Sequence, residues 1–222
     1  MPVIDLNADV GEEVAGADGD GPLLEVVTSA SVACGFHAGG PSVMRATLAD
    51  AVAKGVTVGA HPSYPDRVGF GRRAMEIAPG QLTDDLLYQI GALDGLARAY
   101  GTRVRYVKPH GALYHRMGED EACAAAVCAA LRSYGDLVLL APTGSLAIAT
   151  AEGAGLAVAT EAFADRAYLP DGRLVPRSDT GAVVSDPDAV ADRALRLAVD
   201  HKVTTVDGTD LVLDASSLCI HG

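Results

Sequence analysis

Short runs of apolar and β-branched residues alternate along this chain with longer segments of helical periodicity. The apolar runs cover residues 3–6, 32–36, 56–60, 104–107, 137–141, 156–159 and 211–220. Apolar runs this short are typical of strands that are buried on both faces of a parallel sheet. The pattern therefore predicts about seven strands.

The intervening segments are expected to be helices, over residues 22–31, 41–54, 83–100, 120–134, 145–152 and 186–201. Pro41 suits the first turn of its helix, and Gly55 suits the position just after the last turn. Thr83 places a side-chain oxygen at the start of another helix. Strand and helix thus alternate through the chain.

About seven strand–helix units of roughly 30 residues each indicate an α/β fold with a parallel sheet. No internal repeat or long linker interrupts residues 1–222, so we expect one domain. The alternation fits either an open, doubly wound sheet or a closed barrel. The pattern by itself does not choose between them.

Composition narrows the class of partner. Lys and Arg total 17 against 29 Asp and Glu, which gives a net charge of −12. A chain this acidic is a poor candidate for binding nucleic acid or an anionic membrane. The N-terminus lacks the basic and long apolar regions of a signal peptide, and none of the four cysteines forms a CxxC pair. We therefore expect a cytoplasmic protein.

Polar side chains gather where the predicted strands end. The ends of the strands carry Asn7, Asp9 and Glu12, then His37, His61, Lys108 with His110, Asp165 with Arg166, and finally His221. In parallel α/β folds the carboxyl ends of the strands lie on one face, and active sites form there. Four histidines at the ends of different strands therefore predict one shared polar site.

The residue types in this site allow several chemistries. Carboxylates with imidazoles can act as general bases and acids, or can bind a metal ion. Lys108, Arg72, Arg166 and Arg177 could bind an anionic substrate. The sequence contains no GxxxxGK[ST] motif, so we do not expect this chain alone to bind the phosphates of ATP.

Six segments resemble the LamB/YcsF family. They are IDLNADVGE at 4–12, ACGFHAG at 33–39, GAHPSYPDRVGFGRR at 59–73, VKPHGALY at 107–114, EAFADRAYLPDGRLVPR at 161–177 and CIHG at 219–222. The resemblance runs from residue 4 to the end. It implies a distorted TIM-like (β/α) barrel of about seven strands, related to the sugar-deacetylase barrels. Family members usually continue past HG into a final helix, so we expect that helix to be missing here.

The family includes the A subunit of the bacterial ATP-dependent 5-oxoprolinase, so the resemblance also implies a reaction. In that reaction 5-oxo-L-proline, ATP and water give L-glutamate, ADP and phosphate. The partners implied are separate B and C subunits, which would handle ATP as the co-substrate. A homo-oligomer is also possible. A metal requirement is left open.

The resemblance and the strand-end pattern together nominate the site residues. The expected catalytic residues are Asp9, Glu12, His61, Lys108 and His110, with Asp9 or Glu12 as base, His61 and His110 as proton carriers, and Lys108 stabilising the phosphorylated oxygen. The expected substrate-binding residues are Asn7, His37, Asp66, Arg72, Tyr114, Asp165, Arg166 and Arg177.

Two other functions remain open. The first is a metal-dependent deacetylase or amidohydrolase of the same barrel type, with a metal bound by Asp9, His61 and His110. The second is a non-catalytic scaffold that only completes a complex with the B and C subunits.

Overall fold

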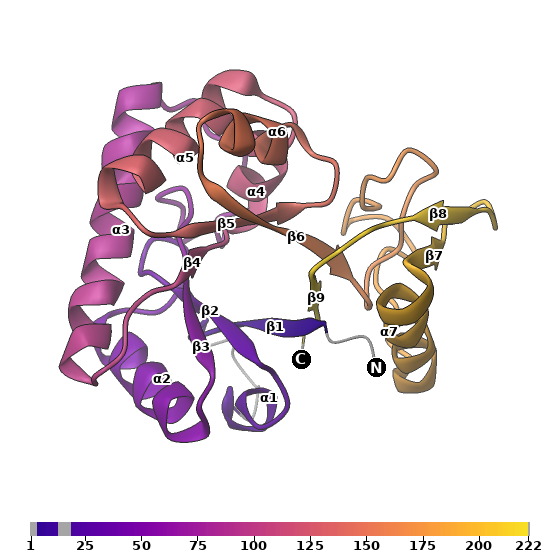
Figure 1. Ribbon diagram of the computed structural model, residues 1–222, viewed down its shortest axis with the longest axis horizontal. Coiled ribbons are helices and arrows are strands. Elements are labelled where there is room, and N and C mark those ends of the chain that lie inside the picture. Colours follow the sequence, from indigo (N-terminus) through magenta and orange to yellow (C-terminus); the bar gives the residue numbers. More distant parts are fainter. Residues whose placement is uncertain (1–3, 13–18, 222) are drawn as a thin grey trace.

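Seven parallel strands close into a barrel in the computed structural model, which describes residues 4–12 and 19–221. The order around the barrel is β1-β2-β3-β4-β5-β6-β9, and Figure 1 shows these strands as a ring. They are β1 (Asp5–Val10), β2 (Ser29–Ala33), β3 (Thr57–His61), β4 (Tyr106–Val107), β5 (Val138–Pro142), β6 (Ala157–Phe163) and β9 (Ser217–Cys219). Parallel pairing of β9 with both β1 and β6 completes the closure. The expected seven-stranded barrel is confirmed.

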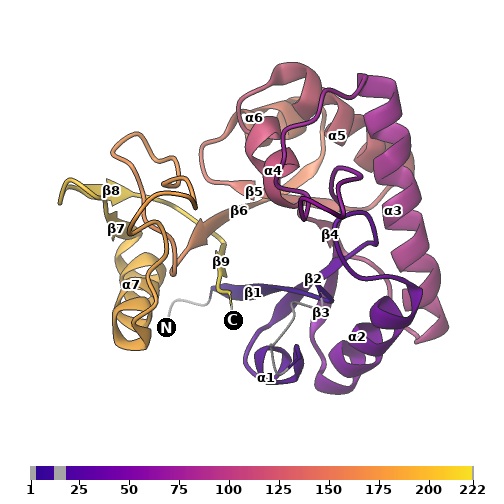
Figure 2. The same ribbon diagram turned by 180° about the vertical axis from the view of Figure 1, so that it is seen from behind.

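Helices cover the outside of this barrel. They are α1 (Gly21–Leu24), α2 (Pro41–Lys54), α3 (Pro79–Ala99), α4 (Gly111–Met117), α5 (Glu121–Tyr134), α6 (Leu146–Gly153) and α7 (Pro187–Asp200). Figures 1 and 2 show α2, α3 and α5 along one side of the ring, while α7 lies on the other side beside the antiparallel pair β7 (Lys202–Thr204) and β8 (Asp210–Val212). Among the described residues, no helix combines the length and apolar character needed to cross a membrane.

Local sequence explains several helix boundaries. Pro41 occupies the first turn of α2, and Gly55 ends that helix with a φ of 71°, a left-handed conformation that favours glycine. The Asp120 side chain accepts a hydrogen bond from the backbone N–H of Cys123 and so caps α5. The predicted helices 41–54 and 120–134 therefore match the observed ones within one residue.

Two element predictions were wrong. The predicted helix 22–31 is helical only in α1, because Ser29 already begins β2. The Ser29 hydroxyl donates to Asp5, and Ala30 pairs with Ala8 of β1, so barrel pairing decides the conformation of this segment. The predicted strand 211–220 is two strands, β8 and β9, which belong to different sheets.

The amino-terminal end of the barrel interior is filled by a polar layer. The hydroxyl of Ser217 donates to Asp5, and the Ser31 hydroxyl lies 3.1 Å from the Tyr106 hydroxyl. The Tyr106 ring occupies the space where a side chain on Gly59 would lie, since a Cβ there would be 2.2 Å from the ring. Glycine at position 59 therefore lets the tyrosine fill the barrel.

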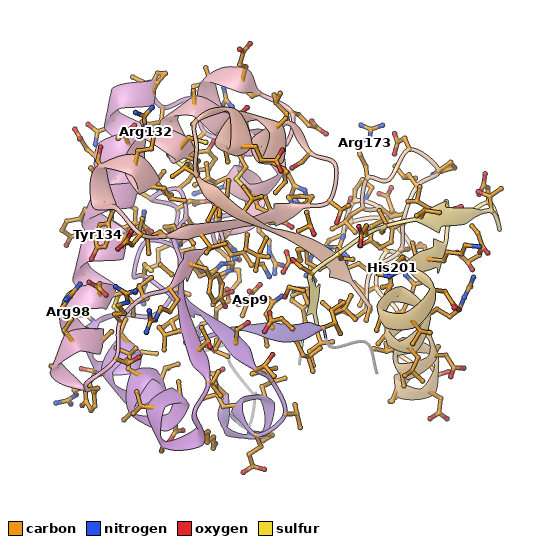
Figure 3. All side chains as sticks on the ribbon, in the orientation of Figure 1. Asp9, Arg98, Arg132, Tyr134, Arg173 and His201 are labelled. Carbon is orange, nitrogen blue, oxygen red and sulfur yellow. The ribbon has the colours of Figure 1, made fainter. Side chains whose placement is uncertain are left out.

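A buried carboxylate joins the long helix α3 to its surroundings. Asp94 accepts hydrogen bonds from the backbone N–H of Val104 at 2.9 Å, from the Tyr134 hydroxyl at 2.6 Å and from Arg98 at 2.7 Å. Figure 3 shows Arg98 and Tyr134 together on this side of the molecule. Burial alone would raise the pKa of Asp94, but these hydrogen bonds outweigh it and hold the pKa below 3.8. Asp94 thus ties α3 to α5 and to the segment that leads into β4.

We expect Asp94→Ala to lower the free energy of unfolding by about 2–3 kcal/mol at pH 7, because two buried donors lose their acceptor. A carboxyl whose pKa is lowered in the folded state stabilises the protein above its unfolded pKa of about 3.9, and this contribution is lost as the pH falls. The difference between wild type and variant should therefore shrink below about pH 4.

Urea denaturation at pH 7 and at pH 3.5 measures this effect. The matched control is Asp84→Ala on the exposed face of α3, which should change stability by less than about 0.5 kcal/mol. Equal stability of the two variants at pH 7 would show that Asp94 does not stabilise the helix contacts.

Candidate active site

Side chains from three neighbouring strands converge at the carboxyl end of the barrel. His37 follows β2, His61 ends β3 and His110 follows β4. The His37 and His110 rings stack at 3.8 Å between centroids, and the His61 ring stands perpendicular to both. Asp9 of β1 contacts this group, with its Oδ2 at 3.3 Å from His61 Nε2. Figure 3 shows Asp9 inside the ring of strands.

Glu12 completes the imidazole cluster. Its Oε1 lies 3.0 Å from His37 Nε2, 3.3 Å from His110 Nδ1 and 3.9 Å from His61 Nε2. One donor atom from each of these four residues lies within 4.8 Å of the others, so the cluster could hold a metal ion. Asp9, Cys219 and His221 form a second such group beside it.

The cluster continues into a buried network centred on Lys108. The ammonium Nζ lies 3.0 Å from Asp9 and 2.9 Å from Glu161, and it donates to the Asn7 amide oxygen at 3.1 Å. Burial would lower the pKa of Lys108, but the charges of Asp9 and Glu161 outweigh it and raise the pKa well above 10.5. Lys108 therefore stays charged and is held on several sides by acceptors.

The charged state of Asp9 follows from the same contacts. Burial would raise its pKa, but the charges of His61 and Lys108 hold the pKa well below 3.8. The pKa of His61 is raised above 6.5, because the attraction of Asp9 exceeds the effect of burial. Asp9 is therefore an ionised carboxylate at neutral pH.

The other two imidazoles are neutral at pH 7. Burial, followed by the charge of His61, lowers the pKa of His37 to about 3 and that of His110 to about 2. Protonation of His110 is therefore far from its working range as a proton carrier, whereas His61 can hold a proton.

A glycine loop packs directly against the imidazoles. Gly71 has a φ of +65°, and a Cβ there would lie 2.8 Å from His110 Cδ2 and 2.9 Å from His37 Cβ. Gly111, with a φ of +56°, leaves room for the carbonyl oxygen of Gly71 at 2.5 Å from its own Cβ position. These two glycines therefore hold the 66–73 loop in contact with the histidine rings.

Asp66 supports that loop from behind. Its carboxylate accepts from the backbone N–H of Gly69 at 2.9 Å and forms an ion pair with Arg73. These contacts place Asp66 in the loop rather than in the wall of the cavity described next, although we expected it to bind substrate.

A cavity of about 650 Å³ opens beside the network. Its wall includes Arg72, Tyr114, Glu161, Arg166 and Arg177. The Tyr114 hydroxyl donates to Glu161 at 2.6 Å. Three of the residues predicted to bind an anion thus face one cavity, next to the buried acids.

The three arginines of this cavity have different surroundings. Arg166 is buried and donates to the carbonyl oxygens of Val175 and Ala182, so it holds its own loop together. Arg177 and Arg72 are exposed. Within the part of the chain that the structure describes, neither forms a salt bridge with a carboxylate. Arg72 lies over the Phe70 ring at 5.0 Å.

The last strand of the barrel also reaches the site. His221 follows β9, and its Nδ1 lies 2.7 Å from Asp165 while its Nε2 lies 3.0 Å from Arg177. Cys219 Sγ lies 3.1 Å from Lys108 Nζ. The shared site of His37, His61, His110 and His221 is therefore present as expected, whereas His201 ends α7 on the far side (Figure 3).

Glu161 is the main site residue that was absent from the predicted set. It accepts from the Asn7 amide at 2.9 Å and from Tyr114, in addition to its ion pair with Lys108. The available signal was its place next to a predicted strand, in the EAFADR motif. The predicted strand stopped at residue 159, whereas β6 continues to Phe163 and carries Glu161 into the barrel.

Comparisons with known proteins agree over the whole chain. The model of the LamB/YcsF family matches residues 4–222. The A subunit of the 5-oxoprolinase of Kocuria rhizophila is 54% identical, over 100% of this chain and 89% of its own length. The protein of the same name from Streptomyces coelicolor is 53% identical, over 99% of this chain and 89% of its own.

Solved structures show the same fold. The crystal structure of the lactam utilization protein from Thermus thermophilus matches with a TM-score of 0.93 and 44% identity, over 100% of this chain and 90% of that one. A putative cellobiose-phosphate cleavage protein from Enterococcus faecalis matches with a TM-score of 0.53 at 11% identity, over 98% of this chain and 78% of that one, which supports the barrel fold alone. From the family match and these relatives, this chain belongs to the LamB/YcsF family.

Proposed function

We propose that this chain is the A subunit of an ATP-dependent 5-oxoprolinase, a hydrolase that opens the lactam of 5-oxo-L-proline to give L-glutamate. The observation that carries the proposal is the name of its relatives, which are about half identical over nearly their full length. The buried acid–imidazole network beside a cavity with exposed arginines supports it. Because these relatives are named for the lactam reaction, we do not propose a deacetylase.

The reaction needs help from partners. A lactam carbonyl is a poor electrophile, and phosphorylation of its oxygen by ATP makes C5 open to attack by water. The C5–N bond then breaks while the ring nitrogen takes a proton, and a second water releases phosphate from the acyl phosphate. The sequence carries no phosphate-binding loop, so separate B and C subunits bind ATP as co-substrate in this proposal.

This chain's residues would act on the water and the leaving nitrogen. Asp9 is ionised and only partly covered, with a side chain 10% exposed, so it is the base that takes a proton from water. Glu12, at 15%, is the second candidate. Lys108 is enclosed by its acceptors, so it acts on substrate by holding Asp9 and Glu161 in place rather than by direct contact.

The carboxylate of 5-oxo-L-proline would bind to the exposed arginines of the cavity. Burial and the charge of Arg177 both lower the pKa of Arg72, which places two guanidinium groups within electrostatic reach of each other. A pair of like charges in one cavity favours an anionic ligand. Tyr114 and Asn7 orient Glu161 at the floor of the same cavity.

Asp9→Asn should abolish glutamate formation, with a loss of roughly 10²–10⁴-fold in kcat, because the amide cannot accept the proton of water. The measurement is glutamate release from 5-oxo-L-proline and ATP by this chain together with its B and C partners. Asp84→Asn, on the exposed face of α3, is the matched control and should keep full activity. Full activity of Asp9→Asn would favour a non-catalytic scaffold.

Arg72→Ala and Arg177→Ala should each raise the KM for 5-oxo-L-proline by roughly 10–100-fold, because each removes a charge-assisted hydrogen bond worth about 1.5–3 kcal/mol. The same coupled assay gives KM and kcat. Arg173→Ala changes an exposed arginine of the same loop that pairs with Asp171, and it should leave KM unchanged. Equal effects of all three substitutions would argue against a carboxylate site formed by Arg72 and Arg177.

A further inference from the structure

The cluster of Glu12, His37, His61 and His110 has the spacing of a ligand shell. The carboxylate oxygen lies 3.0 to 3.9 Å from the three ring nitrogens, and His61 Nε2 lies 2.9 Å from His110 Nδ1. Metal–ligand bonds of about 2.0–2.1 Å in a tetrahedral site separate the ligand atoms by about 3.3 Å. The observed distances bracket this value.

The hydrogen bonds behind the rings determine where their protons lie. His61 Nδ1 is 2.6 Å from the Lys108 carbonyl oxygen, and His110 Nε2 is 2.9 Å from the Phe70 carbonyl oxygen. A carbonyl oxygen only accepts, so each of these nitrogens carries the hydrogen. In the neutral rings, the lone pairs of His61 Nε2 and His110 Nδ1 then point at each other. Two lone pairs at 2.9 Å repel unless a cation lies between them.

The third ring supports the same conclusion. His37 is stacked on His110 with an angle of 1° between the rings, and its side chain is fully buried. Two protonated imidazoles stacked face to face would repel, so this pair is favoured as neutral rings, the form that binds metals. The backbone carbonyls behind His61 and His110 are the outer partners that metal-ligating histidines ordinarily have.

We propose that Glu12, His37, His61 and His110 bind one divalent transition-metal ion at the mouth of the barrel. Three imidazole nitrogens and one carboxylate oxygen favour an ion such as Zn²⁺ over Mg²⁺ or Ca²⁺, which prefer oxygen ligands. Asp9 is not one of the four ligands, so it remains available as a base. The site does not depend on which substrate the protein binds. The rival explanation for the facing nitrogens is a single proton shared by His61 and His110.

Metal content separates an ion from a proton. Purified protein from cells grown with added Zn²⁺, Mn²⁺ and Co²⁺ should contain about one metal ion per chain by mass spectrometry. After chelation, titration with Co²⁺ should give the visible absorption of a nitrogen-ligated ion. Zn²⁺ at about 100 times its Kd should raise the Tm by roughly 5–10 °C.

Variants identify the ligands. His37→Ala, His110→Ala and Glu12→Gln should each weaken metal binding by at least roughly 100-fold. His201→Asn is the control, because His201 ends α7 with a φ of 53° that asparagine tolerates, and it should bind metal like the wild type. Circular dichroism confirms folding, and Glu12→Gln, at the partly exposed edge, is the variant least expected to disturb the core.

Two results would overturn the metal site. One is protein without stoichiometric metal that also binds neither Co²⁺ nor Zn²⁺ in titration. The other is binding that is unchanged in the folded His37, His110 and Glu12 variants. The proposed function fails separately, since a metal-loaded chain that forms no glutamate with its partners would disprove the lactam reaction and leave the metal site in place.

Discussion

The mouth of the barrel depends on one buried ammonium group. Lys108 contacts carboxylates from the first and sixth strands, Asp9 and Glu161, and it also contacts the sulfur of Cys219 from the last strand. Without that charge, two buried carboxylates would face each other uncompensated. Leaving such a charge unpaired typically costs about 3–5 kcal/mol. The same ion pairs also set the geometry of Asp9 beside His61, so packing and chemistry share one interaction.

Much of this site could be predicted from the sequence, because strand-end residues in a parallel barrel must meet at one face. His37, His61 and His110 lie far apart in the chain, yet their positions after successive strands bring their rings into contact. The boundaries of α2 followed from Pro41 and Gly55, whose backbone preferences are local. Closure of the sheet was predicted by the family resemblance, since alternation of strands and helices fits an open sheet equally well.

Residues whose role depends on their partners could not be predicted. Arg166 and Arg177 look alike in sequence, but the first uses its guanidinium on backbone carbonyls and the second points toward His221. Asp66 likewise spends its carboxylate on Gly69 and Arg73. Residues 22–31 were assigned to a helix because their local preference is helical, whereas pairing of Ser29 and Ala30 with β1 depends on residues outside the segment.

The position of β9 between β1 and β6 has a consequence for biosynthesis. Ribosomes make the chain from its amino end, so six strands of the barrel emerge before the strand that joins the sixth to the first. Until residues 217–221 are released, Asp5 lacks Ser217, and Lys108 lacks Cys219. The nascent chain therefore cannot assemble a complete catalytic centre, and cofactors or substrate would meet it only after translation of this chain is nearly finished.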